Sequence, residues 1–406
     1  MNIEPNVMAA ITAPLFLIFL LGEYLFSGYK KRDVFKYEST ISNISIGIAE
    51  RFTNLFVSLL FFNLFVWVYD NYAIFSISDS WYIALPLLLV ADFVWYWYHR
   101  LGHQINIFWA AHIVHHHSEE FNFSAASRIT IIQAFIRTPF WCVLPLLGFH
   151  PKQVMTVLVF HGMYSFFTHT QMIKAPKWSE TILITPSLHG VHHASNEKYL
   201  DKNFGDVFVF WDKLFGTFQK ENEKPVYGIT HPLHRHSFLW QHFHYYFEIF
   251  EGIKGTKKIK EKLKIVFGSP NIMKEEYREK AEETFFNNLP KCNLNPNLKN
   301  YINAQVVLVF LILSMISYQF EKCNAIEIGC YTGILFITLI NIGALLEQRK
   351  WIYYLEIIRI SLLALFFCTT FHYWELDFVV ILGILTLTIK KSYKEWYFEE
   401  FLQYKN

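Results

Sequence analysis

Charged residues are scarce in this sequence. Lys, Arg, Asp and Glu together make up 17% of its 406 residues, whereas hydrophobic residues make up 53% and aromatic residues 19%. Ordinary soluble domains carry about 25% charged residues, so this composition favours a membrane protein. The formal net charge is only +2, and no basic stripe interleaved with aromatic residues is present, so we expect no nucleic-acid partner.

Cysteine and the common cofactor motifs are also rare or missing. The five cysteines have no paired spacing, which argues against a zinc ribbon or a disulfide framework, and we expect Cys323 and Cys330 to remain unbridged although they share a loop. The chain has neither the glycine fingerprint of a dinucleotide-binding fold nor a haem-attachment motif. The first apolar run lacks a basic segment before it and a small-residue cleavage site after it, so we expect a retained helix.

Long apolar runs are what the sequence has in abundance. Nine of them are long enough and poor enough in charge to cross a bilayer, and the pair between 131 and 170 is also compatible with a re-entrant hairpin. The runs cover residues 9–27, 46–69, 82–98, 131–149, 153–170, 302–320, 330–346, 351–371 and 376–390. We therefore predict an all-α, polytopic membrane helical bundle of about nine spans.

The distribution of Lys and Arg assigns a side to each connection, because these residues collect in cytoplasmic loops. The stretch "YKKRDVFK" and the lysine-rich region 171–300 are predicted to be cytoplasmic, and 69–80, without Lys or Arg, to be outside. The N-terminus is then outside and the C-terminus inside. We expect four parts: N-terminal membrane helices (1–81), a motif-bearing catalytic region (82–236), cytoplasmic linker helices (237–300) and C-terminal membrane helices (301–406).

Histidine clusters strongly in the second of these parts. Twelve of the eighteen histidines lie between His99 and His193. Eight of them form three motifs, which we call the histidine boxes. The boxes are "HRLGH" (His99, His103), "HIVHH" (His112, His115, His116) and "HGVHH" (His189, His192, His193).

The spacing within each box suits a metal site at the cytoplasmic ends of the spans. Residues three or four apart share one face of a helix, so each box can aim its imidazoles at one point or at two neighbouring points. Eight ligands are too many for one tetrahedral zinc ion, so two metals with about four imidazoles each fit the count. Imidazole suits iron, copper, zinc and nickel alike, but a redox metal beside apolar helices suits oxidation of a lipid C–H bond.

Several residues near the boxes are candidates to orient the ligands through hydrogen bonds. Asp92 is the strongest, because a carboxylate within an apolar span is costly unless it is paired. Helix caps or solvated loop positions are equally good explanations for the others. These are Glu119, Glu120, Asn122, Asn196, Asp201, Asn203 and Asp212. We interpret His117 as a bystander, and the later cluster "HPLHRHSFLWQHFH" as an interfacial segment.

With these motifs the sequence resembles the fatty acid hydroxylase and sterol desaturase superfamily of membrane di-iron enzymes. Within it, "WYWYHRLGHQINIFWAAHIVHHHSEEFNFSAASR" and "PSLHGVHHASNEKYLDKNFGDVFVFWDKLFGTF" look most like the alkylglycerol monooxygenases. The resemblance implies two iron ions, O2, a lipid substrate and an external reductant, tetrahydrobiopterin in that family. It implies hydroxylation beside an ether oxygen, which releases a fatty aldehyde.

The resemblance also implies ligands between the second and third boxes, where His169 matches best and His161 is a further candidate. Gln104 departs from the family pattern, which has Glu directly after the first box.

Two alternative functions remain open at this point. The same metal pair would serve a sterol or fatty-acyl hydroxylase or desaturase. A divalent-metal transporter or sensor is the other alternative, although it predicts ligands near the bilayer midplane.

Overall fold

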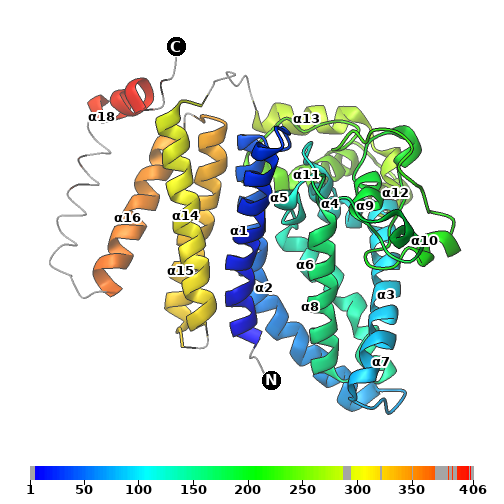
Figure 1. Cartoon of the computed structure of the whole chain (residues 1–406). Helices are drawn as coiled ribbons and strands as arrows, with labels where there is room; N and C mark the ends of the chain where they lie inside the picture. Colours follow the sequence, from blue (N-terminus) through cyan, green and yellow to red (C-terminus); the bar gives the residue numbers. More distant parts are fainter. Residues whose placement is uncertain are drawn as a thin grey trace. The chain divides into compact units, whose positions relative to one another are not determined.

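The regular secondary structure of the described residues consists of helices. This computed structural model describes residues 5–286, 294–320, 322–349, 351–370, 383, 386, 391–401 and 403. Within these ranges, extended backbone pairs only at two isolated antiparallel bridges, Leu183–Phe208 and Ala194–Tyr227. The all-α prediction is confirmed (Figure 1). The predicted span 376–390 lies outside the described residues apart from 383 and 386.

The described residues divide into two compact units. One unit comprises residues 14–234 and 242–285, and we call it the box unit because it holds all three histidine boxes. The other comprises the described residues of 1–13, 235–241 and 286–406. The four-part division expected from the sequence stays a prediction.

The box unit is built from the helices that come before residue 286. They are α1 (Pro5–Tyr29), α2 (Tyr37–Tyr72), α3 (Ala84–Gln104), α4 (Asn106–His116), α5 (Phe123–Ala126), α6 (Ile131–Arg137), α7 (Val143–Leu147), α8 (Pro151–Thr168), α9 (Pro186–His192), α10 (Phe210–Leu214), α11 (Phe238–Lys254), α12 (Ile259–Phe267) and α13 (Glu275–Phe285). The first residues of α1 and α11 belong to the other unit.

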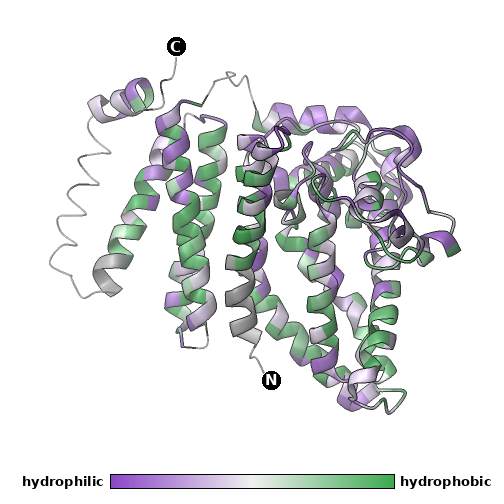
Figure 2. Cartoon of the chain, viewed as in Figure 1, coloured by the Kyte–Doolittle hydropathy of each residue, from purple (hydrophilic) through white to green (hydrophobic). Residues whose placement is uncertain are grey.

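The second unit contains a pair of long apolar helices followed by shorter segments. Its helices are α14 (Pro296–Gln319), α15 (Ala325–Leu346), α16 (Ile352–Thr370) and α18 (Lys391–Trp396), with a π-helical turn at Tyr397–Phe401. Figure 2 shows hydrophobic residues along α14 and α15, and hydrophilic residues along α13 of the box unit. Cys323 and Cys330, in the connection between α14 and α15 and at the start of α15, are free thiols, as expected.

Four described helices are long and apolar enough to cross a membrane. They are Tyr37–Tyr72, Trp81–Gln104, Pro296–Gln319 and Ala325–Leu346. These agree with four of the nine predicted spans, and the full count of nine stays a prediction. The run 131–149 does not form one helix: α6 passes into a 3-10 segment, Thr138–Cys142, and then α7. Pro139 and Pro145 explain the break, since proline lacks the N–H that a continuous helix needs.

The first turns of α2 lie beyond what a bilayer requires. With 36 residues α2 is about 54 Å long, whereas about 20 residues cross the hydrocarbon core. Its early residue Asn43 donates to Ser124 Oγ (2.9 Å) and accepts from Arg128 (2.6 Å). Arg128 also donates from Nε to the Val114 carbonyl on α4 (2.8 Å). These buried bonds fix the second histidine box against α2.

The apolar core of the box unit joins α2, α3, α7 and α8. Phe61 and Phe65 of α2 pack with Leu87 and Ala91 of α3, and Val157 of α8 belongs to the same cluster. A second cluster joins α4 to α11 and α12. The first cluster therefore anchors α3, which carries the first box, and the second cluster anchors α4, which carries the second box.

Candidate dimetal centre

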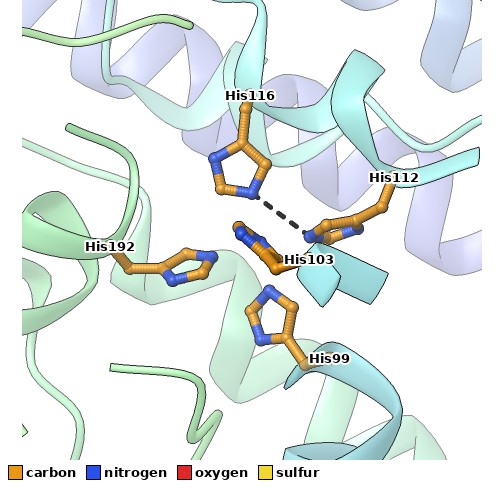
Figure 3. Close-up of side chains that lie close together, drawn as sticks. All are labelled: His99, His103, His112, His116 and His192. Atoms are coloured by element: carbon orange, nitrogen blue, oxygen red, sulfur yellow. Dashed lines mark hydrogen bonds between the residues drawn. The ribbon is translucent and has the colours of Figure 1, made fainter. Parts of the chain in front are cut away.

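Nine histidines of the box unit gather into two groups. Group A consists of His99, His103, His112, His116 and His192, and group B of His115, His169, His189 and His193. In each group, one ring nitrogen from every residue lies within 4.8 Å of those of the others. Figure 3 shows the five rings of group A converging from different helices. All eight box histidines and His169 are thus placed in a group.

Helical spacing explains how three boxes supply two groups. The first box lies on the last turns of α3 and gives both of its histidines to group A. The second box, on α4, gives two histidines to group A and one to group B, whereas the third box, on α9, gives one to A and two to B. The groups are neighbours, since the His116 and His193 rings stack with centroids 4.5 Å apart.

The inward-facing nitrogens have the spacing of ligands around a common centre. Nε2 of His112 lies 3.2 Å from Nε2 of His116. In group B, Nε2 of His169 lies 3.2 Å from that of His115 and 3.0 Å from that of His189. Two imidazole nitrogens at about 2.1 Å from one metal ion are about 3 Å apart when they subtend about 90°. These distances therefore fit a metal in each group.

Backbone carbonyls fix the tautomers that a metal site requires. Nδ1 of His99 donates to the Phe204 carbonyl (2.9 Å), and Nδ1 of His192 donates to the Lys202 carbonyl (2.8 Å). Nδ1 of His169 donates to the Ser165 carbonyl (2.8 Å). Each Nε2 then carries a lone pair, and those of His99 and His192 are buried without any hydrogen-bond partner. Such orphaned acceptors are costly unless a ligand satisfies them, which supports the fit to metal.

Burial keeps the imidazoles of the two groups uncharged. Removal from water, reinforced by the neighbouring imidazoles, lowers the pKa of His112, His116 and His193 well below the usual value. They are therefore neutral at physiological pH. Neutral imidazole is the species that binds metals.

Asp92 is buried, as expected for a carboxylate in an apolar span, but its contacts differ from the expected ones. It faces His161 rather than a box histidine, with Oδ1 3.0 Å from His161 Nε2. It also accepts from the backbone N–H of Val207 (2.9 Å) and Phe208 (3.0 Å). Asp92 thus holds the loop that contains Phe204, and the Phe204 carbonyl in turn accepts a hydrogen bond from the ligand His99.

His161 lies outside both groups. Its Nε2 faces Asp92, and its Nδ1 lies 2.9 Å from Asp206 Oδ2. Because carboxylates face both ring nitrogens, neither nitrogen points toward the two histidine groups, and the contacts of His161 favour a structural role over that of a metal ligand. The position of His161 on an apolar helix gives no sign of these two carboxylates, since both come from other segments of the chain.

The acidic and amide residues after the second box have their contacts outside groups A and B, and Glu119 faces His234 (3.6 Å from Nδ1), which belongs to neither group. Glu119 is 41% exposed and lies 3.7 Å from Lys36 Nζ, while buried Glu120 pairs with the same lysine at 2.9 Å. Asn122 caps α5: its Oδ1 accepts from Ser124 N (2.9 Å) and its Nδ2 donates to the Val34 carbonyl. The helix-cap explanation therefore suits Asn122 better than a role beside the metals.

Residues after the third box do reach the ligands. Asp201 Oδ1 lies 3.4 Å from His103 Nδ1. Asp212 is buried and accepts from the backbone N–H of Phe204 and Gly205 (2.7 and 2.8 Å). Asn203 binds the Leu188 carbonyl at 2.9 Å. Residues 201–204 thus contact three of the five group A histidines. The Asp201 side chain faces His103, and the carbonyls of residues 202 and 204 accept hydrogen bonds from His192 and His99.

Four further residues named by the sequence motifs lie outside both groups. The His117 ring lies 4.7 Å from that of His244 on α11, in keeping with a bystander. His242 and His244 are buried, so part of the later histidine cluster packs inside the unit rather than at an interface. Gln104 is the exposed last residue of α3.

Sequence reasoning missed Gln133 and Asp206. Gln133 Nε2 lies 3.3 Å from His112 Nδ1, although it comes from α6. Asp206 lacks any box-like spacing. The only feature of the sequence that could have pointed to these two residues is that polar side chains are rare near apolar runs. The backbone carbonyls that bind the histidines cannot be recognised from the sequence, because every residue has a carbonyl.

A helical protein with apolar spans and two adjacent polyhistidine groups has the features of a membrane oxidoreductase of the histidine-box class. Residues 84–217 match the family model described as fatty acid hydroxylase. Alkylglycerol monooxygenase of Homo sapiens is 32% identical over 85% of this chain and 79% of that protein. The Danio rerio enzyme is 29% identical (87% and 80%), and that of Caenorhabditis elegans 28% (87% and 75%).

The chain therefore belongs to the alkylglycerol monooxygenase family within the fatty acid hydroxylase superfamily. No solved structure matches it. The protein is an integral membrane enzyme, an O2-dependent oxidoreductase that modifies lipids. The transporter or sensor alternative is not needed to explain the histidines.

Proposed function

We propose that this enzyme cleaves the ether bond of alkylglycerols. The carbon next to the ether oxygen is hydroxylated, and the resulting hemiacetal breaks down to a fatty aldehyde and the free glycerol hydroxyl. One atom of O2 enters the C–H bond and the other leaves as water, with two electrons and two protons from a donor. The observation that carries the proposal is the pair of buried histidine groups in a chain related along most of its length to alkylglycerol monooxygenases.

We assign one iron ion to each histidine group. His99, His103, His112, His116 and His192 would hold the first, and His115, His169, His189 and His193 the second. Iron bound there would supply the O2-dependent oxidation of a C–H bond, which zinc cannot do because it has no redox chemistry. We propose tetrahydrobiopterin as the external electron donor, by analogy with the family.

The protein's own residues contribute orientation and an apolar approach. The Phe204, Lys202 and Ser165 carbonyls hold three imidazoles with Nε2 directed inward. His99 lies near the end of the apolar helix α3, and His169 directly follows α8. A lipid whose alkyl chain lies along these helices would present its ether linkage near the groups. We place the groups on the cytoplasmic side, as the lysine distribution predicts.

The test is an aldehyde-release assay on membranes that contain the full-length enzyme. Labelled alkylglycerol, tetrahydrobiopterin and O2 are supplied, and labelled fatty aldehyde is measured. We expect aldehyde from the unmodified enzyme and none from His116→Ala, while the adjacent variant His117→Ala retains activity because His117 lies outside both groups. If no aldehyde forms but a sterol or acyl lipid is oxidised, the ether-lipid proposal is wrong and the alternative hydroxylase function replaces it.

A further inference from the structure

Large apolar side chains are exposed on the segment between α8 and the third box and on α10. Trp178 is 70% exposed, Ile182 51% and Leu214 68%. The two stretches are joined: Val209 N donates to the Ile182 carbonyl (3.0 Å), and Lys213 Nζ donates to the Thr181 carbonyl (2.9 Å). We call Trp178, Ile182 and Leu214 the exposed patch. Large apolar side chains left uncovered by the protein on neighbouring segments indicate a contact surface.

The exposed patch is attached to the flank of a candidate membrane span. The Trp211 ring of α10 lies 4.9 Å from Phe93, and Phe215 lies 5.0 Å from Trp97, both on α3. Phe93 is eleven residues, or about 17 Å, before the end of the span Trp81–Gln104. The segment that carries the patch therefore reaches back along α3 into the depth that a bilayer would occupy.

The charges around the patch suit a lipid surface. Lys174, Lys177 and Lys213 border it, and all three are exposed. The acidic residues nearby are turned elsewhere: Asp212 is buried against backbone N–H groups, and Glu180 accepts from Thr185 Oγ1 at 3.4 Å. Tryptophan with lysine is the combination found where protein meets lipid headgroups, and lysines near the surface attract anionic lipids.

We propose that the exposed patch docks on the headgroup layer, rich in anionic lipid, of the leaflet in which α3 ends. The region 171–300 is then not wholly surrounded by water, because part of it is interfacial. The segment continues through Ile184, which donates to the Val207 carbonyl (2.9 Å), into Thr185, the cap of α9. Docking thus holds the third histidine box next to the lipid surface from which a membrane substrate must come.

Spin labels on the full-length enzyme in lipid nanodiscs test this docking. Single cysteines replace Trp178 or Leu214, after serine has replaced the five native cysteines, and each carries a nitroxide. The control is Glu283→Cys, an exposed position on α13, whose sequence is mostly charged. In nanodiscs with anionic lipid we expect the labels at 178 and 214 to collide more with O2 than with a water-soluble nickel chelate, at a depth of about 5–10 Å. The control label should show the reverse.

The outcomes separate lipid from other partners. Equal access of the nickel chelate at 178, 214 and 283 would overturn the proposal, because the patch would then face water. Labels shielded from both reagents would show contact with protein, such as a second copy, and would also overturn it. The double variant Lys174→Glu/Lys177→Glu, combined with the label at 214, should lose the dependence of label depth on anionic lipid. An unchanged dependence would contradict the role given to the lysines.

Discussion

Replacement of Asp92 is the substitution whose effect can be worked out most fully. The side chain is fully buried in α3, and it accepts from two backbone N–H groups and faces His161. Asp92→Ala leaves the N–H groups of Val207 and Phe208 without a partner. A buried unsatisfied donor costs about 1–3 kcal/mol, so we expect a loss of about 2–6 kcal/mol in the free energy of unfolding. That is a large part of the roughly 5–15 kcal/mol that stabilises a typical protein.

The same substitution should weaken metal binding by group A. The loop held by Asp92 supplies the Phe204 carbonyl to His99, and loss of an outer partner of a metal ligand typically costs about 10–100-fold in affinity. Asp92→Asn keeps the shape and one acceptor oxygen, so both effects should be smaller. Iron affinity is measured by chelator competition and stability by thermal unfolding in one detergent, with exposed Asp79→Asn as the control. A destabilised Asp92→Ala with unchanged iron affinity would refute the positioning role.

Three further perturbations follow from the same contacts. His103→Ala should lower the metal content of group A alone, and His193→Ala that of group B alone. Metal analysis should therefore find about half of the bound iron in each variant. Complete loss of iron in both variants would show that the two groups form one shared site. Arg128→Met should lower the free energy of unfolding by about 3 kcal/mol, because Asn43 Oδ1 and the Val114 carbonyl lose their donor; an unchanged melting temperature would contradict this. Gly47→Ala should cost about 1–3 kcal/mol, since a Cβ there would lie 2.6 Å from Ser127 Cβ, whereas Gly22→Ala, with open space around it, should be neutral in the same measurement.

The gathering of the histidines can be predicted from the sequence because helical spacing is local. Residues three and four apart share one face of a helix regardless of the tertiary structure. The amino-acid sequence is therefore enough to predict that the boxes on α4 and α9 each direct their imidazoles to one side of the helix. The sequence does not reveal that each of these two boxes divides between two groups. That division depends on the rotation of α4 against α9, which distant packing sets.

The partners of these histidines are much harder to predict. The atoms that hold His99 and His192 are carbonyls of residues 204 and 202, and any residue type can supply a carbonyl. Asp92 stands out in the sequence as a carboxylate in an apolar span, but its partners come from residues 161 and 207–208, far along the chain. The broken run 131–149 shows a limit of hydropathy: Pro139 and Pro145 interrupt the α-helical hydrogen bonding of the run, although its apolar content stays high.

Metal analysis of the full-length enzyme, purified without oxygen, tests the central claim most directly. Two irons per chain, with a spectroscopic signature of interacting metals, are the predicted result, because groups A and B adjoin through His116 and His193. One tightly bound zinc ion per chain and no iron would contradict the account.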